Sequence, residues 1–386
     1  MKEIFEISKD SFLQVSLGEN LILSDKAEKI LILSPEAKTV MEGYLEGKSP
    51  NEIVKVIERK TGFSEEQSSQ FVTTFLSSLE AQLQSHPSDP ESPESHPLPD
   101  ISPFTTKGYE IYGKRCLIHY GNIDTHNILH PLIAHTETTY PPETADLTFH
   151  LIAMDDTYTF YRNGEELVRE KSLVYVKNVA LFEIFAALFP KKSWLTVFHG
   201  AVVKKGDQAV ILSGFSGKGK STLTTYLVQK GFSLISDDLA VLESESAGVM
   251  ATPYAISLKE DTWDLLSRHL PKVASLKPWE IYGESLKFYM PSGASTENNP
   301  SSPIKKALLV FINYENGAET QVEPMTPVDA LGKIIGIGAW ISHKEDHLKK
   351  LMAWLESTPA YELTYPDLES AEKKIREIID SGMEIS

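Results

Sequence analysis

The first eighty residues change from short apolar runs to a helical spacing of apolar positions. Three short apolar runs within residues 12–33 predict a small meander of β-strands. Beyond them, apolar residues recur every three or four positions in three segments that begin at Ser34, Ser49 and Ser64. Serine favours a helix start because its side-chain oxygen accepts a hydrogen bond from a free backbone N–H. The pattern therefore predicts strands followed by three helices, a small winged-helix-like unit.

Residues 84–104 separate this unit from the rest of the chain. They are rich in proline, serine and acidic residues and carry few apolar side chains to bury. This composition is typical of a semi-extended linker. We therefore expect one domain over residues 1–83 and a second over residues 105–386.

The second domain begins with alternating positions and continues with fully apolar runs. Alternation at 148–152 and 157–161, followed by a turn at 162–165, predicts an antiparallel sheet. The later runs predict helices at 179–188 and 327–335. They also predict buried strands, at 197–203, 209–212 and 306–312. This mixture of helices and strands predicts the α/β class.

Composition excludes several classes of protein. The 386 residues are 41% hydrophobic, which supports packed domains, and carry a net charge of -17, from 37 basic against 54 acidic residues. A sequence-independent nucleic-acid clamp needs a basic surface, so we expect no nucleic-acid partner. A single cysteine, Cys116, excludes a disulfide framework within the chain. The absence of a long apolar run or a signal-like start predicts a soluble, cytoplasmic protein with no membrane partner.

One segment fits a phosphate-binding motif at every fixed position. Residues 214–221 read Gly-Phe-Ser-Gly-Lys-Gly-Lys-Ser, the pattern G-x-x-x-x-G-K-[ST], between a predicted strand and a predicted helix at 221–230. Such a loop presents backbone N–H groups to phosphate oxygens. We expect Lys220 to reach the outer phosphates and Ser221 to bind Mg²⁺. The residues expected to bind ATP are Gly214, Ser216, Gly217, Lys218, Gly219, Lys220, Ser221 and Thr222. The alternative is an ordinary glycine turn before a helix.

Polar residues interrupt or end the apolar strands on both sides of this loop. His199 lies within the run 197–203, and Asp237-Asp238 end the run 232–236. Near a bound triphosphate, one carboxylate of such a pair would ligate Mg²⁺ while the other accepts a proton. His199 would then lie near the transferred phosphate. A hydrogen-bonded core histidine and an exposed Asp-Asp turn are the structural alternatives.

The N-terminal domain resembles the PqqD family of precursor-peptide recognition elements. The resemblance covers about residues 10–82 and rests on the runs 21–23 and 31–37, the turn 45–49 and the tail 75–79. It implies a module that binds a leader peptide by adding it as a strand at the sheet edge. A small appendage that only stabilises or dimerises the chain is the alternative.

The segments 199–201, 214–222 and 236–238 resemble, in order and spacing, the motifs of the HPr kinase/phosphorylase family. That family shares its core with ATP-dependent phosphoenolpyruvate carboxykinases, and weaker similarity extends over about 195–340. The resemblance implies a P-loop α/β core in which Asp237 is the general base toward a seryl hydroxyl. It also implies that Asp238 and Ser221 hold Mg²⁺, that Lys220 with the loop amides holds the phosphates, and that His199 assists phosphate positioning or proton handling. HPr kinases assemble as oligomers, so a homo-oligomer is possible here.

The chain departs from that family at one signature. The family carries Glu-Ile-Arg-Gly downstream, whereas this chain has Glu280-Ile281-Tyr282-Gly283, without the arginine. Reverse phosphorolysis is therefore doubtful. Lys259 and Lys287 are the candidates from the sequence for the missing positive charge.

These observations favour an ATP- and Mg²⁺-dependent kinase that phosphorylates a serine hydroxyl of a peptide or protein held by the N-terminal domain. Two alternatives stay open. One is a kinase for a small metabolite such as free serine, with a regulatory N-terminal domain. The other is a nucleotide-dependent binding switch or ATPase without an acceptor. Loss of transfer on deletion of residues 1–100 would favour the peptide or protein kinase over the metabolite kinase.

Overall fold

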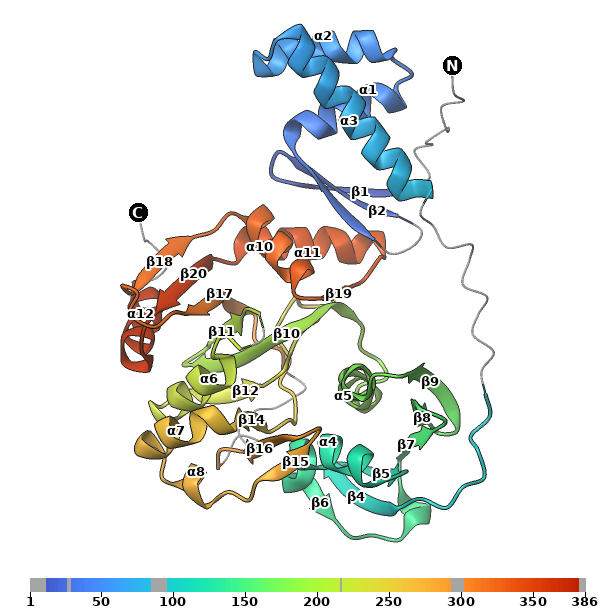
Figure 1. The fold of residues 1–386 in the computed structure, drawn as a ribbon, viewed down its shortest axis with the longest axis vertical. Coiled ribbons are helices and arrows are strands. Elements are labelled where there is room, and N and C mark those ends of the chain that lie inside the picture. Colours follow the sequence, from blue (N-terminus) through green and yellow to red (C-terminus); the bar gives the residue numbers. More distant parts are fainter. Residues whose placement is uncertain (1–11, 26–28, 85–95, 216, 293–301, 382–386) are drawn as a thin grey trace. The chain divides into compact units, whose positions relative to one another are not determined.

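The computed structural model describes residues 12–25, 29–84, 96–215, 217–292 and 302–381, which form an α/β structure with several sheets (Figure 1). The expected α/β class is confirmed. The chain divides into two compact units. Unit 1 comprises residues 1–94, 326–332 and 341–357, and unit 2 comprises 95–325, 333–340 and 358–386. Residues 85–95, within the predicted linker, lie outside the described residues, and the domain boundary drawn from the sequence stays a prediction.

Unit 1 begins with an antiparallel sheet of order β1-β2-β3, followed by three helices. The strands are β1 (Phe12–Leu17), β2 (Asn20–Asp25) and β3 (Ile30–Leu33), and the helices are α1 (Pro35–Leu45), α2 (Pro50–Thr61) and α3 (Glu65–Gln84). Each helix begins after the expected serine. Ser34 accepts from the N–H of Ala37, Ser49 forms a reciprocal capping box with Glu52, and Ser64 caps α3. This succession of elements confirms the expected strands and helices.

The core of unit 1 lies between the sheet and the helices. Leu23 of β2, Met41 of α1 and Leu79 of α3 are buried in one cluster. Unit 1 also includes α11 (Glu345–Ser357), and the backbone N–H of Gly18 donates a hydrogen bond to the Glu356 carboxylate at 3.0 Å.

Unit 2 begins with a mixed sheet of order β6-β4-β5-β7-β8-β9. Its strands are β4 (Thr105–Ile111), β5 (Lys114–Tyr120), β6 (Glu137–Thr138), β7 (Leu147–Met154), β8 (Thr157–Arg162) and β9 (Glu165–Glu170). Two helices accompany it, α4 (Ile123–Ile133) and α5 (Leu173–Leu188). The expected strands at 148–152 and 157–161 are confirmed. The helix expected at 179–188 begins earlier, because Ser172 accepts a hydrogen bond from the N–H of Tyr175 and so caps α5.

The central sheet of unit 2 follows the path β12-β10-β11-β17-β20-β18, with β13 also paired to β10. Its strands are β10 (Trp194–Lys205), β11 (Gln208–Ser213), β12 (Ser233–Ser236), β13 (Leu239–Glu243), β17 (Lys306–Tyr314), β18 (Gln321–Pro324) and β20 (Ala360–Tyr365). β11, β17 and β20 run parallel. Two helices, α6 (Lys220–Gln229) and α12 (Leu368–Asp380), share one apolar core with this sheet. The expected strand–loop–helix at 209–230 is confirmed.

The remaining elements of the chain are short. A small antiparallel sheet of order β14-β16-β15 is formed by β14 (Ile256–Lys259), β15 (Trp279–Ile281) and β16 (Glu284–Tyr289). The other elements are α7 (Trp263–His269), α8 (Lys272–Ser275), α10 (Pro327–Gly336) and β19 (Trp340–Ile341). Within the described residues, no helix combines the length and the apolar composition that crossing a membrane requires.

Candidate functional site

Strand β10 brings three sequence motifs together because it has neighbours on both edges. On one edge it pairs antiparallel with β11, with Gly200 opposite Ser213. β11 therefore ends beside the middle of β10, where the glycine loop begins, which is the segment between β11 and α6. On the other edge it pairs with β13, where His199 lies opposite Leu239, and then with β12. The turn between β12 and β13 is Asp237-Asp238. The two carboxylates therefore lie beside His199, across β10 from the start of the glycine loop.

The glycine loop encloses the Lys220 ammonium. Its Nζ donates to the backbone oxygen of Gly214 at 2.7 Å and to that of Phe215 at 3.2 Å. Gly217 and Gly219 have φ of +80° and +84°, a region that glycine enters without strain. Burial lowers the pKa of Lys220, which the nearby carboxylates partly offset. Two backbone oxygens of the loop thus surround the Lys220 ammonium at the N-terminus of α6. In the motif G-x-x-x-x-G-K-[ST], this is the position from which the lysine reaches phosphates.

Asp237 is buried against the first turn of α6. Its carboxylate accepts a hydrogen bond from the Ser221 hydroxyl at 3.3 Å and from the backbone N–H of Ser257 at 3.2 Å. The residue is only 1% exposed. Burial, followed by the charge of Asp238, raises the pKa of Asp237 to about 8. The structure therefore places one member of the carboxylate pair against α6, the helix that follows the glycine loop.

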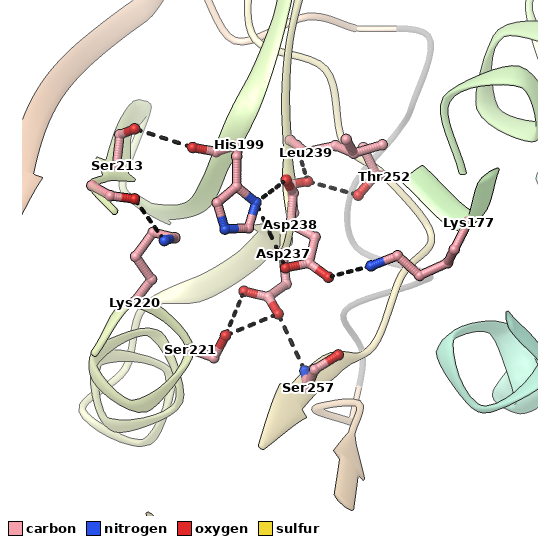
Figure 2. A network of polar contacts seen from close by, with 12 residues as sticks. Lys177, His199, Ser213, Lys220, Ser221, Asp237, Asp238, Leu239, Thr252 and Ser257 are labelled. Carbon is pink, nitrogen blue, oxygen red and sulfur yellow. Dashed lines mark hydrogen bonds and ion pairs between the residues drawn. The ribbon is translucent and has the colours of Figure 1, made fainter. Parts of the chain in front are cut away.

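Asp238 faces two basic side chains instead. It has φ of +67°, in the left-handed region. The Lys177 Nζ lies 3.7 Å from one carboxylate oxygen, and the His199 Nδ1 lies 3.9 Å from the other (Figure 2). The His199 Nδ1 also lies 3.1 Å from the Asp238 backbone oxygen, a distance at which an Nδ1–H would donate to it. Burial lowers the pKa of His199, which favours the neutral ring.

The residues expected to form the site are brought together, with two qualifications to the sequence analysis. Ser221 and Asp238, expected to share Mg²⁺, contact different partners, since the Ser221 hydroxyl faces Asp237. Ser216 lies outside the described residues. Thr222 lies in the first turn of α6, and the backbone oxygen of Lys218 accepts a hydrogen bond from Tyr365 at 3.4 Å.

The two lysines expected to replace the missing arginine are engaged elsewhere. Lys259 pairs with Glu284 at 3.3 Å on the surface. Lys287 is buried, donates to the backbone oxygen of Val273 at 3.0 Å, and lies over the Trp263 ring. Among the described residues, neither lysine contacts Asp237 or Asp238.

The oxygen atoms of this site suit a magnesium ion only if phosphates and water complete its coordination shell. Among the described residues, no group of three or more His, Cys, Asp and Glu side chains is placed to hold a metal by itself. The Ser221 hydroxyl and the Asp237 carboxylate are hard oxygen donors 3.3 Å apart. Because Mg²⁺ usually takes one or two protein ligands and completes its shell with phosphates and water, these groups suit it.

Sequence reasoning missed Lys177. This lysine lies in the first turns of α5, before the segment where a helix was expected, and it comes from the part of unit 2 that precedes the glycine loop. The sequence signal that could have identified Lys177 is a charged residue within an apolar stretch. Its neighbours Leu173, Val176 and Ala180 are buried in the structure. A charged residue at the border of such a helix needs a partner, and only the tertiary structure shows that the partner is Asp238.

The chain is similar to solved structures, but it matches no family model and no curated protein. One of these structures, that of the Hpr(Ser) kinase/phosphatase from Coxiella burnetii, aligns with 48% of this chain and 98% of its own chain, at 10% sequence identity and a TM-score of 0.23.

Proposed function

We propose that the chain is an ATP- and Mg²⁺-dependent kinase that transfers the γ-phosphoryl group to a serine hydroxyl of a peptide or protein. One observation carries this proposal. A buried carboxylate, Asp237, contacts the Ser221 hydroxyl of the phosphate-loop helix and adjoins a second carboxylate, while Lys220 lies inside the loop. A phosphate cradle next to a carboxylate pair supplies what phosphoryl transfer needs, namely charge stabilisation and a proton acceptor.

The residues divide the reaction between them. Lys220 and the loop amides hold the phosphates. Ser221 and Asp238 would hold Mg²⁺, which would neutralise charge on the phosphate oxygens. Asp237 accepts the proton of the acceptor hydroxyl as its oxygen bonds to the γ-phosphorus. The bond from that phosphorus to the β–γ bridging oxygen breaks, and ADP leaves with the electron pair. The raised pKa of Asp237 suits a group that takes up and releases a proton near neutral pH.

The sheet of unit 1 supports the choice of a peptide or protein acceptor. In the described residues β3 ends the order β1-β2-β3 and pairs with β2 alone. An edge strand has free N–H and C=O groups with which an extended peptide can pair. We propose that a leader-like segment of the substrate binds there, as the resemblance to the PqqD family implies.

The test is transfer of label from γ-³²P-ATP in the presence of Mg²⁺, with a peptide and protein fraction and a small-molecule fraction of the source lysate as separate acceptors. We expect a labelled peptide or protein, and loss of about 10²–10⁴-fold in rate for Asp237→Asn, because a positioned base typically contributes that much. Label confined to small molecules would indicate a metabolite kinase. Release of free phosphate alone would indicate an ATPase or a binding switch.

Two variants, Lys220→Ala and Asp237→Asn, separate the roles. Lys220→Ala should weaken ATP binding as well as turnover, and unchanged ATP affinity would contradict the phosphate-cradle assignment. For Asp237→Asn, an unchanged Mg²⁺ concentration at half-maximal rate supports the role of base. A strongly raised requirement for Mg²⁺ would instead assign Asp237 to the metal with Ser221, and the base to Asp238.

A further inference from the structure

Lys177 is held at the carboxylate pair by the packing of its own helix. On α5, Val176, Ala180 and Leu181 are buried in the same apolar cluster as Leu239 and Val241 of β13, the strand that follows the Asp237-Asp238 turn. The Tyr254 hydroxyl donates a hydrogen bond to the backbone oxygen of Leu181, which ties α5 to the segment just before Ser257. α5 and the strand after the carboxylate turn thus share one core, which fixes the backbone position of Lys177 relative to the site.

Lys177 is a largely buried basic residue with a carboxylate as its ion-pair partner. Its side chain is 16% exposed, and its ammonium lies 3.7 Å from the Asp238 carboxylate. Figure 2 shows Lys220 and Lys177 on opposite sides of the Asp237–Asp238 pair. Lys220 serves the side of the nucleotide, because it lies in the glycine loop. Lys177 lies on the side of the carboxylates away from the glycine loop, and in-line transfer requires the acceptor on the side of the phosphoryl group away from ADP.

We propose that Lys177 is a catalytic residue that contacts the transferring phosphoryl group from the acceptor side. This inference rests on the proposed function. In phosphoryl transfer, negative charge is spread over the equatorial oxygens of the transferred group, and a cation placed against them stabilises the transition state. Lys177 supplies this cation. Lys259 and Lys287 do not supply it, because their side chains contact other partners. Its pairing with Asp238 holds it near the position that the phosphoryl group passes through.

The test compares affinity for Mg²⁺-ADP with affinity for Mg²⁺-ADP plus aluminium fluoride, which mimics the transferring phosphoryl group. We expect Lys177→Met to weaken binding of the fluoroaluminate complex by about tenfold or more, because a charge-assisted contact is lost. Its affinity for Mg²⁺-ADP should stay within about twofold of the wild type. Lys177→Arg should restore part of the loss. The exposed Lys171, which precedes α5, provides the matched control in Lys171→Met, which should change neither affinity.

A purely structural role for Lys177 gives a different pattern. If Lys177 only balances the charge of Asp238, Lys177→Met will have no effect on fluoroaluminate binding in an Asp238→Asn background. Measured at a Mg²⁺ concentration at which Asp238→Asn itself still binds the complex, that result would overturn the proposal. Persistence of the effect in that background supports it. A fall in thermal midpoint together with equal loss for both ligands would also overturn it. Failure of the wild type to bind Mg²⁺-ADP refutes the proposed function itself, and this inference with it.

Discussion

Two glycines of the loop between β11 and α6 differ in the atoms that an added methyl group would contact. Gly217 and Gly219 have nearly the same φ, +80° and +84°. A Cβ on Gly217 would have no heavy atom within 4 Å, whereas a Cβ on Gly219 would lie 2.9 Å from the hydroxyl oxygen of Tyr365. Alanine at either position costs about 1–2 kcal/mol for the left-handed backbone. We expect Gly219→Ala to cost about 1–3 kcal/mol more than Gly217→Ala, because the buried Tyr365 ring must shift.

The Tyr365 hydroxyl allows this difference to be tested with a double-mutant cycle. Tyr365→Phe removes the oxygen that the new methyl group would meet, at the cost of a weak hydrogen bond to the Lys218 backbone oxygen at 3.4 Å. It should therefore relieve most of the excess cost of Gly219→Ala and leave the cost of Gly217→Ala unchanged. The free energies of unfolding come from urea titrations followed by circular dichroism, accepted where the m-values agree.

Binding of Mg²⁺-ADP gives a second readout of the same cycle. Distortion at Gly219 moves the N–H groups at the start of α6, and each 1.4 kcal/mol of lost binding energy lowers affinity about tenfold. The reasoning is refuted if the two alanine variants lose equal stability both with Tyr365 in place and in the Tyr365→Phe background, since the contact with the hydroxyl would then carry no energy.

Two further predictions concern stability away from the loop. Burial, with a contribution from His126, lowers the pKa of His130 from 6.5 to about 4, so the unfolded chain binds the proton first and stability falls as the pH drops from 6.5 towards 4. The loss through this residue is at most about 3–4 kcal/mol, at 1.36 kcal/mol for each pKa unit. His130→Gln should therefore flatten the pH dependence of the urea midpoint, and an unchanged slope would contradict this reasoning. Gly248→Ala should destabilise by about 1–3 kcal/mol, because its Cβ would lie 2.5 Å from that of Pro303. Gly332→Ala should instead raise the thermal midpoint measured by calorimetry, because Gly332 is an exposed position of α10 with no atom near the new methyl group. Equal midpoints for Gly248→Ala and Gly332→Ala would exclude the clash at Gly248.

Local structure followed from the sequence wherever short-range chemistry fixes it. The caps at Ser34, Ser49 and Ser64 were identified from one serine and its neighbours, because a capping hydrogen bond spans only two or three residues. The strand–loop–helix around Lys220 was predicted for the same reason, since its motif is continuous in the chain. The early start of α5 was missed because its cap at Ser172 precedes an apolar stretch without clear helical periodicity.

The sequence by itself determined the α/β class, the capped helices and the candidate phosphate loop, because each depends on neighbouring residues and on the spacing of apolar positions. Only the tertiary structure decided which carboxylate meets Ser221 and which meets Lys177. Those contacts depend on strand pairing, because one edge of β10 pairs first with β13 and then with β12. They also depend on the core that α5 shares with β13. The burial of Asp237, which raises its pKa, likewise arises from chain segments that meet only after folding. Pairing register and desolvation are properties of the packed chain, so no local pattern could specify them.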